Sequence, residues 1–144
     1  MTELRLDKED FSQLARQILS EGHALRFRTV GVSMWPLIRD GDLVEIQPAA
    51  PDSYRKGDIL LYEQQRGVLL VHRVIAVRWE DDQMSLLMQG DALRSADGLA
   101  ALSQVLGRVA LVDRNGRLIH LDSPFQRLLG RLLAVFLPLY KQLI

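Results

Sequence analysis

Residues 29–46 read TVGVSMWPLIRDGDLVEI, and the rest of the chain is best understood by working outward from this stretch. A short apolar run delivers Ser33 into a bend that has Gly31 before it and Pro36 after it. The following motif, Arg39-Asp40-Gly41-Asp42, predicts a turn that leads into a short strand. A serine in such a bend projects from the backbone, which suits a nucleophile. Because a serine hydroxyl is weak by itself, the chain must also supply a base.

The composition is that of an ordinary globular domain. The 144 residues are 48% hydrophobic and 25% charged, which is enough to bury a core. Eighteen basic residues balance eighteen acidic ones, so no net field favours nucleic acid as a partner. The sequence has no cysteine, which excludes disulfides and cysteine-ligated zinc, and no glycine-rich phosphate loop follows a predicted strand. We therefore expect no cofactor and no metal.

Residues 7–21 predict an amphipathic helix, with Asp7 as its N-cap and Gly22 as its stop. The apolar residues that recur on one face of this helix are Phe11, Leu14, Ala15, Ile18 and Leu19. We expect this face to cover the core.

From residue 24 onward the apolar pattern changes to a period of two or to short runs, which is typical of strands. The predicted strands are residues 25–30, 43–47, 58–63, 67–78, 84–89, 105–113 and 117–121. The Asn115-Gly116 pair between the last two indicates a hairpin. Short strands joined by turns predict a mainly β fold, with coiled antiparallel sheets or a partial barrel.

The two ends of the chain bear on its location. Residues 1–13 are too charged for a signal peptide, and no window holds the eighteen consecutive apolar residues of a conventional membrane span. Residues 124–144 predict an apolar helix interrupted by Pro138. This helix either packs on the sheet or a partner, lies in a membrane interface as a peripheral contact, or, as the least favoured alternative, spans the membrane. We expect one domain over 1–144, divided into a helix (1–23), a β core with the site (24–121) and an apolar C-terminal helix (122–144). The sequence does not decide whether the protein is cytoplasmic or peripherally membrane-associated.

Three histidines are candidates for the base. His23 follows the first helix and His120 lies in a hairpin strand, so both suit surface or structural roles. His72 lies within the apolar run Leu69–Ile75, where a neutral imidazole is favoured and suits a general base. A loop carrying Asp91 and Asp97 follows, and a carboxylate from it would orient the imidazole. A serine, a histidine and an aspartate scattered along a chain do not by themselves indicate a catalytic site, because most chains of this length contain them.

A more specific signal comes from five whole segments of sequence that occur in a fixed order. The segments are GVSMWPLIRDGDLV (31–44), KGDILLY (56–62), VHRVI (71–75), QGDA (89–92) and GRV (107–109). Together they resemble the boxes of type I signal peptidases and the related LexA-like serine peptidases. The third box carries His72 where bacterial members carry lysine, so the chain resembles the Ser-His branch typical of the endoplasmic reticulum and archaea.

The resemblance implies roles for particular residues. It implies Ser33 as the nucleophile, His72 as the general base and Asp97 as the residue that orients His72. Asp91 is then either an alternative orienter or a structural acid. The N–H of Ser33 would be one oxyanion donor. The neighbouring positions expected to contact the oxyanion or the substrate are Gly31, Met34 and Pro36.

The implied activity is that of a serine endopeptidase, which cleaves an extended peptide or precursor protein through an acyl-enzyme. Family members favour small residues next to the cut. Two departures favour an alternative, a catalytically degenerate module that binds a peptide or a membrane protein. Gly31 stands where members often have a hydroxyl residue, and a charged helix replaces the usual N-terminal anchor. A self-cleaving repressor is disfavoured because neither Ala-Gly nor Cys-Gly occurs in the chain.

Overall fold

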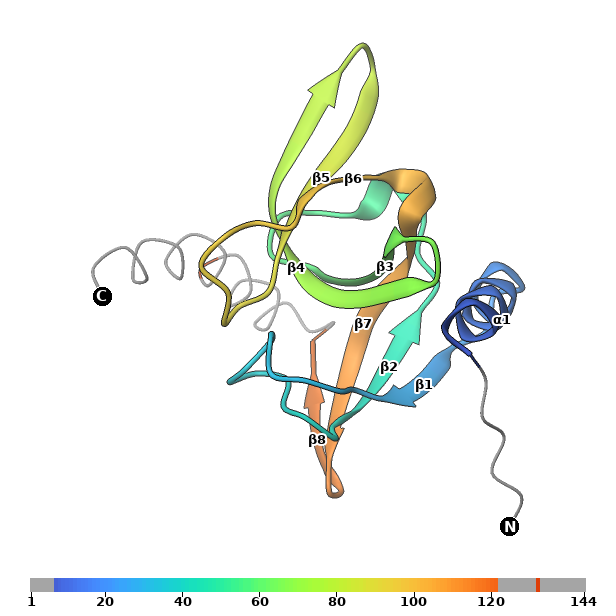
Figure 1. Cartoon of the computed structure of the whole chain (residues 1–144), viewed down its shortest axis with the longest axis vertical. Helices are drawn as coiled ribbons and strands as arrows, with labels where there is room; N and C mark the ends of the chain where they lie inside the picture. Colours follow the sequence, from blue (N-terminus) through green and yellow to red (C-terminus); the bar gives the residue numbers. More distant parts are fainter. Residues whose placement is uncertain (1–6, 122–131, 133–144) are drawn as a thin grey trace.

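The computed structural model describes residues 7–121 and residue 132. Within them the chain forms one α-helix, eight strands and two short 3-10 turns (Figure 1). In chain order these are α1 (Lys8–Ser20), β1 (Leu25–Arg28), β2 (Leu43–Gln47), η1 (Pro51–Ser53), β3 (Ile59–Gln65), β4 (Val68–Glu80), β5 (Gln83–Gln89), β6 (Gly98–Ala101), η2 (Leu102–Gln104), β7 (Val105–Arg114) and β8 (Arg117–His120).

All eight strands belong to one antiparallel sheet that is not closed. The order along the sheet is β1-β2-β7-β3-β4-β5-β6, and β8 pairs with β7. Hairpin turns set the local register: Asp81 and Asp82 join β4 to β5, and Asn115 and Gly116 join β7 to β8, all with positive φ. Such turns match the twist of antiparallel strands. The prediction of a mainly β, antiparallel fold is therefore confirmed.

Strand β3 lies at the centre of the packing because both of its faces are buried. Leu61 joins a cluster that contains Ala15 and Leu19 of α1, whereas Leu60 and Tyr62 join a second cluster with β5 and β6. Successive side chains of a strand point to opposite faces, so one short strand serves both clusters. Helix α1 packs against β1, β4 and β7 and covers the first cluster (Figure 1).

The N-terminal helix begins where the sequence indicates, with the Asp7 side chain accepting the Asp10 N–H at 2.8 Å. Its buried face differs from the prediction in one respect. Leu14 was expected to face the core but is 43% exposed, whereas Ser12 is buried. The Ser12 hydroxyl donates to Glu63 Oε2 of β3 at 2.5 Å.

Two strand predictions also need correction. The strand expected at 25–30 ends at Arg28, because Gly31 turns the chain in the left-handed region with a φ of +98°. Strand β6 was not expected, since Gly98–Ala101 lacks the β-branched and aromatic residues that mark strands. It forms because it pairs with β5 from Ser85 to Met88.

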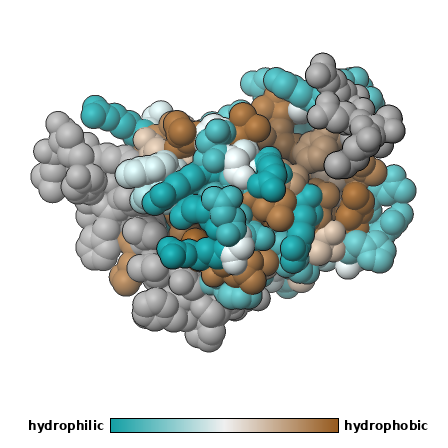
Figure 2. Space-filling model, turned by 90° about the horizontal axis from the view of Figure 1, so that it is seen from below, coloured by the Kyte–Doolittle hydropathy of each residue, from teal (hydrophilic) through white to brown (hydrophobic). Residues whose placement is uncertain are grey.

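The predicted C-terminal helix, residues 122–144, lies outside the described residues except for Leu132. Among the described residues, no helix has the length and apolar character that a membrane crossing requires. Seen from below, the surface alternates between hydrophobic and hydrophilic side chains (Figure 2).

Candidate active site

Ser33 lies in the serine loop, residues 29–42, which connects β1 to β2. The turn before the serine depends on Gly31, whose N–H donates to Asp40 Oδ1 at 2.8 Å. Thr29 keeps two backbone bonds across the loop, to the Asp42 carbonyl and from the Gly41 N–H. Hydrogen bonds therefore join the two ends of the loop, and Ser33 lies on the segment between them.

Asp42 anchors the far end of the serine loop to β7. Its carboxylate accepts two bonds from Arg114, at 3.1 and 2.8 Å, and Arg114 also donates to the Leu37 carbonyl at 2.9 Å. Burial of Asp42 opposes its ionisation, but the bonds from Arg114 and from the Arg39 N–H prevail and lower the pKa of Asp42. The loop is thus held by a charged pair at the edge of the core.

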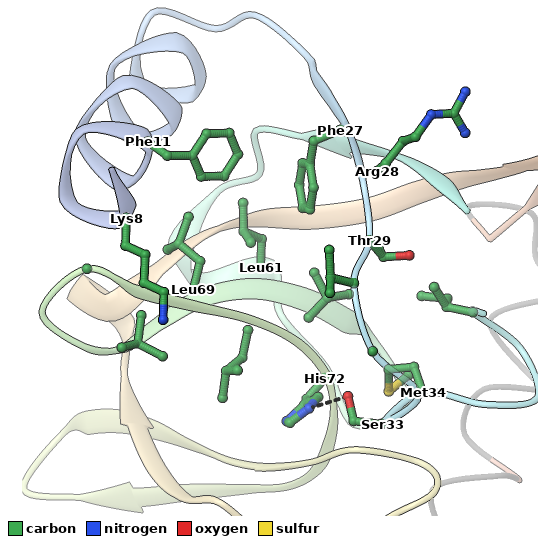
Figure 3. A pocket seen from close by; sticks show the side chains of 17 residues that line it. Lys8, Phe11, Phe27, Arg28, Thr29, Ser33, Met34, Leu61, Leu69 and His72 are labelled. Carbon is green, nitrogen blue, oxygen red and sulfur yellow. Dashed lines mark hydrogen bonds between the residues drawn. The ribbon is translucent and has the colours of Figure 1, made fainter. Parts of the chain in front are cut away.

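His72 brings its imidazole to the serine from β4. The ring is buried, and its Nε2 lies 3.0 Å from Ser33 Oγ (Figure 3). Its Nδ1 lies 2.5 Å from Asp97 Oδ2. The three side chains therefore form one continuous Ser-His-Asp hydrogen-bond chain, although they come from three separate parts of the sequence.

Asp97 is the last residue of the acidic loop, residues 90–97, between β5 and β6. Its N–H donates to the Met88 carbonyl at 2.7 Å, and its Oδ2 also accepts a hydrogen bond from the Tyr62 hydroxyl. Burial, followed by the hydrogen bond to Asp97, raises the pKa of Tyr62 far above its ordinary value. The phenol therefore stays protonated and remains a donor to Asp97.

The other aspartate of the acidic loop has a different partner. Asp91 accepts two bonds from Arg73, both at 2.8 Å, and both side chains are buried. Arg73 also donates to the Gly57 carbonyl at 2.8 Å, and the Asp91 N–H points to Met34 Sδ at 3.4 Å. Of the two candidate aspartates, Asp97 contacts His72 and Asp91 contacts Arg73.

Gly90 allows the acidic loop to lie directly on the serine loop. A Cβ at this position would stand 2.7 Å from the Ser33 carbonyl oxygen and 3.1 Å from His72 Nε2. The Ala92 N–H donates to the same carbonyl at 2.9 Å. Only glycine leaves room for this approach, so Gly90 helps to set the distance between Ser33 and His72.

The remaining predicted positions surround Ser33 in different ways. Within residues 7–121 and 132, the Ser33 N–H donates to no acceptor, whereas the Gly31 N–H is engaged by Asp40. Met34 is buried and, like Ser33, lines a groove that leads away from the site. Pro36 follows a cis peptide bond, is exposed, and does not line the groove.

A groove of about 530 Å³ leads away from Ser33 and His72. Its walls come from β1 and the start of the serine loop on one side and from residues 67–72 on the other, with α1 at the far end (Figure 3). The apolar lining includes Phe11, Phe27, Leu61, Leu69 and Val71, and the charged lining residues are Lys8 and Arg28.

Both walls of the groove contain a strand with an unpaired edge. Strand β1 pairs only with β2 among the described strands. The first part of β4 pairs with β3, and β5 joins β4 only from Arg73 onward. Backbone N–H and C=O groups on these edges are therefore available for a further strand.

Sequence reasoning assigned no role to Tyr62 or Gly90. Both lie inside segments that carried the family resemblance, yet their partners are distant: Tyr62 and Asp97 are 35 residues apart. No local pattern signals such a contact. Among the described residues there is no group of three or more His, Cys, Asp or Glu side chains arranged to hold a metal.

A scan against protein-family models finds no match for this chain, and a search of curated proteins finds none either.

Proposed function

We propose that this protein is a serine endopeptidase that resembles the Ser-His branch of the signal peptidase and LexA-like superfamily. One observation carries the proposal: Ser33 Oγ, His72 and Asp97 form a hydrogen-bond chain of 3.0 and 2.5 Å at the end of an apolar groove. A nucleophile, a base and an orienting acid in this order are the components of acyl transfer.

The contacts support the following mechanism. Asp97 accepts the Nδ1–H of His72, which leaves the Nε2 lone pair directed at Ser33. When Ser33 Oγ attacks a peptide carbonyl, His72 takes the hydroxyl proton and becomes an imidazolium that Asp97 stabilises. The imidazolium then returns this proton to the leaving amine as the C–N bond breaks. A water molecule, activated by the same histidine, hydrolyses the resulting ester on Ser33.

Oxyanion stabilisation requires donors near Ser33. The Ser33 N–H suits this role because no acceptor among the described residues engages it. The Gly31 N–H already donates to Asp40 at 2.8 Å, so it contributes only if that bond opens when substrate binds.

The groove supports an extended peptide as substrate. A strand inserted between β1 and the first part of β4 would pair with unpaired backbone on both sides. Alternate side chains of that strand would enter the apolar space beside Leu69 and Val71. The volume of about 530 Å³ is within the range that ligand sites occupy.

The direct test is covalent labelling with a fluorophosphonate, followed by intact-mass spectrometry and peptide mapping. We expect one adduct, on Ser33, and none in Ser33→Ala. The exposed Ser95 in the acidic loop provides the matched control, since Ser95→Ala should label like the wild type. A wild-type protein that folds but takes no label at Ser33 would overturn the peptidase proposal and favour the non-catalytic binding module.

A substrate can be sought with the same variant. Ser33→Ala retains the groove and the Asp97–His72 pair, so it should hold peptides that the wild type cleaves. Mass spectrometry of peptides retained by Ser33→Ala, and of their fragments after addition of wild-type protein, would identify the cut.

A further inference from the structure

Tyr62 makes a contact that the three-residue chain does not require. It lies on β3, is 2% exposed, and donates its hydroxyl hydrogen bond to Asp97 Oδ2. That oxygen is also the one 2.5 Å from His72 Nδ1. The Tyr62 and His72 rings lie 6.4 Å apart at 58°, so the phenol reaches Asp97 from the side rather than by stacking on the imidazole.

The position of Asp97 at the end of an exposed loop gives the hydrogen bond from Tyr62 a structural role. Residues 92–96, just before it, are exposed, and its own N–H bond to Met88 fixes only the backbone. In contrast, β3 is buried on both faces and pairs with β4 and β7. Tyr62 therefore links the carboxylate of an exposed loop to the most enclosed strand of the sheet.

We propose that Tyr62 is a positioning residue of the Ser33-His72-Asp97 chain: its hydroxyl holds the Asp97 carboxylate in place and shares its negative charge. This inference rests on the proposed function. The phenol withdraws part of the charge that Asp97 would otherwise direct at His72.

The other groups around His72 do not substitute for Tyr62. Ser33 approaches Nε2 from the serine loop, and Asp97 approaches Nδ1 from the acidic loop. The neighbouring ion pair, Arg73 with Asp91, has both of its charges engaged with each other. Among the described residues, the Tyr62 hydroxyl is the group from β3 that meets the Asp97 carboxylate.

Tyr62→Phe removes the hydroxyl and keeps the ring. The matched control is Tyr54→Phe, because Tyr54 is a buried tyrosine of the same core cluster but its ring packs against Arg108. The rate of fluorophosphonate labelling should fall about tenfold in Tyr62→Phe, since a hydrogen bond to a charged group is lost. Tyr54→Phe should leave this rate unchanged.

A second measurement does not depend on activity. The proton between His72 Nδ1 and Asp97 should give a downfield ¹H resonance in the free protein, assigned by its loss in His72→Gln. It should move in Tyr62→Phe and stay in place in Tyr54→Phe. If the wild type takes no label, the proposed function fails, and this resonance still tests the role of Tyr62.

Should Tyr62→Phe fail to fold, 3-fluorotyrosine incorporated at position 62 provides the comparison. Its more acidic hydroxyl donates more strongly, so the resonance should again shift. A labelling rate and a resonance that match the wild type in every Tyr62 variant would overturn the proposal, because a residue that serves only packing would produce that result.

Discussion

Replacing Gly90 by alanine is expected to separate the serine from its base. The added Cβ would stand 2.7 Å from the Ser33 carbonyl oxygen, 3.0 Å from Leu93 Cδ1 and 3.1 Å from His72 Nε2. The first contact is with backbone, which cannot rotate away as a side chain can. The Ala92 N–H also holds the Ser33 carbonyl at 2.9 Å, so the two loops must move apart as units.

The size of the movement follows from these contacts. Ordinary van der Waals contact begins at 3.4 Å, so the serine loop and Gly90 must separate by about 0.7 Å. Displacements near 1 Å in a catalytic geometry reduce rates by about 10²-fold, and we expect a loss of that order in labelling of Ser33. Overpacking of this kind also lowers the free energy of unfolding by about 1–3 kcal/mol.

The assay compares labelling rate with stability in urea. Gly116→Ala is the matched control, because a Cβ there meets nothing within 4 Å but the residue has a φ of +87°. That variant should lose about 1–2 kcal/mol of stability through backbone strain while it labels at the wild-type rate. A Gly90→Ala protein that labels as fast as the wild type would refute the steric argument.

Two further predictions concern the carboxylates. Asp97→Asn should reduce labelling of Ser33 by about 10³–10⁴-fold, because an amide favours the wrong tautomer of His72. Its stability in urea should change little. Near-normal labelling would show that Asp97 does not orient His72. The Ser12 hydrogen bond lowers the pKa of Glu63, so the stability that this bond contributes is complete above the ordinary glutamate pKa of 4.5 and is lost as pH falls through the lowered pKa. Ser12→Ala should therefore reduce the free energy of unfolding at pH 7 by about 1–2 kcal/mol, and the loss of stability between pH 7 and pH 3 should be smaller than in the wild type. Urea unfolding with an unchanged pH dependence would contradict this.

Local patterns in the sequence were sufficient for most of the secondary structure. The α1 boundaries follow from Asp7 and Gly22, and the hairpin at Asn115 and Gly116 follows from residues that accept positive φ. These features depend on interactions between residues close in sequence, so short patterns predict them. Where a contact with a residue far away in the sequence determines the structure, the local patterns gave the wrong prediction. Ser12, not Leu14, is buried and binds Glu63, which lies 51 residues away, and β6 pairs with β5 although its own residues do not mark a strand.

The same division applies to the candidate site. By itself, the sequence determined that Ser33 lies in a bend, that His72 lies in an apolar strand, and that two aspartates follow in one loop, because each of these is a local property. Only the tertiary structure decided that Asp97, rather than Asp91, contacts His72. It also brought Tyr62 to the same carboxylate. These contacts join strands and loops 18 to 35 residues apart, and side-chain direction on packed strands decides which groups meet.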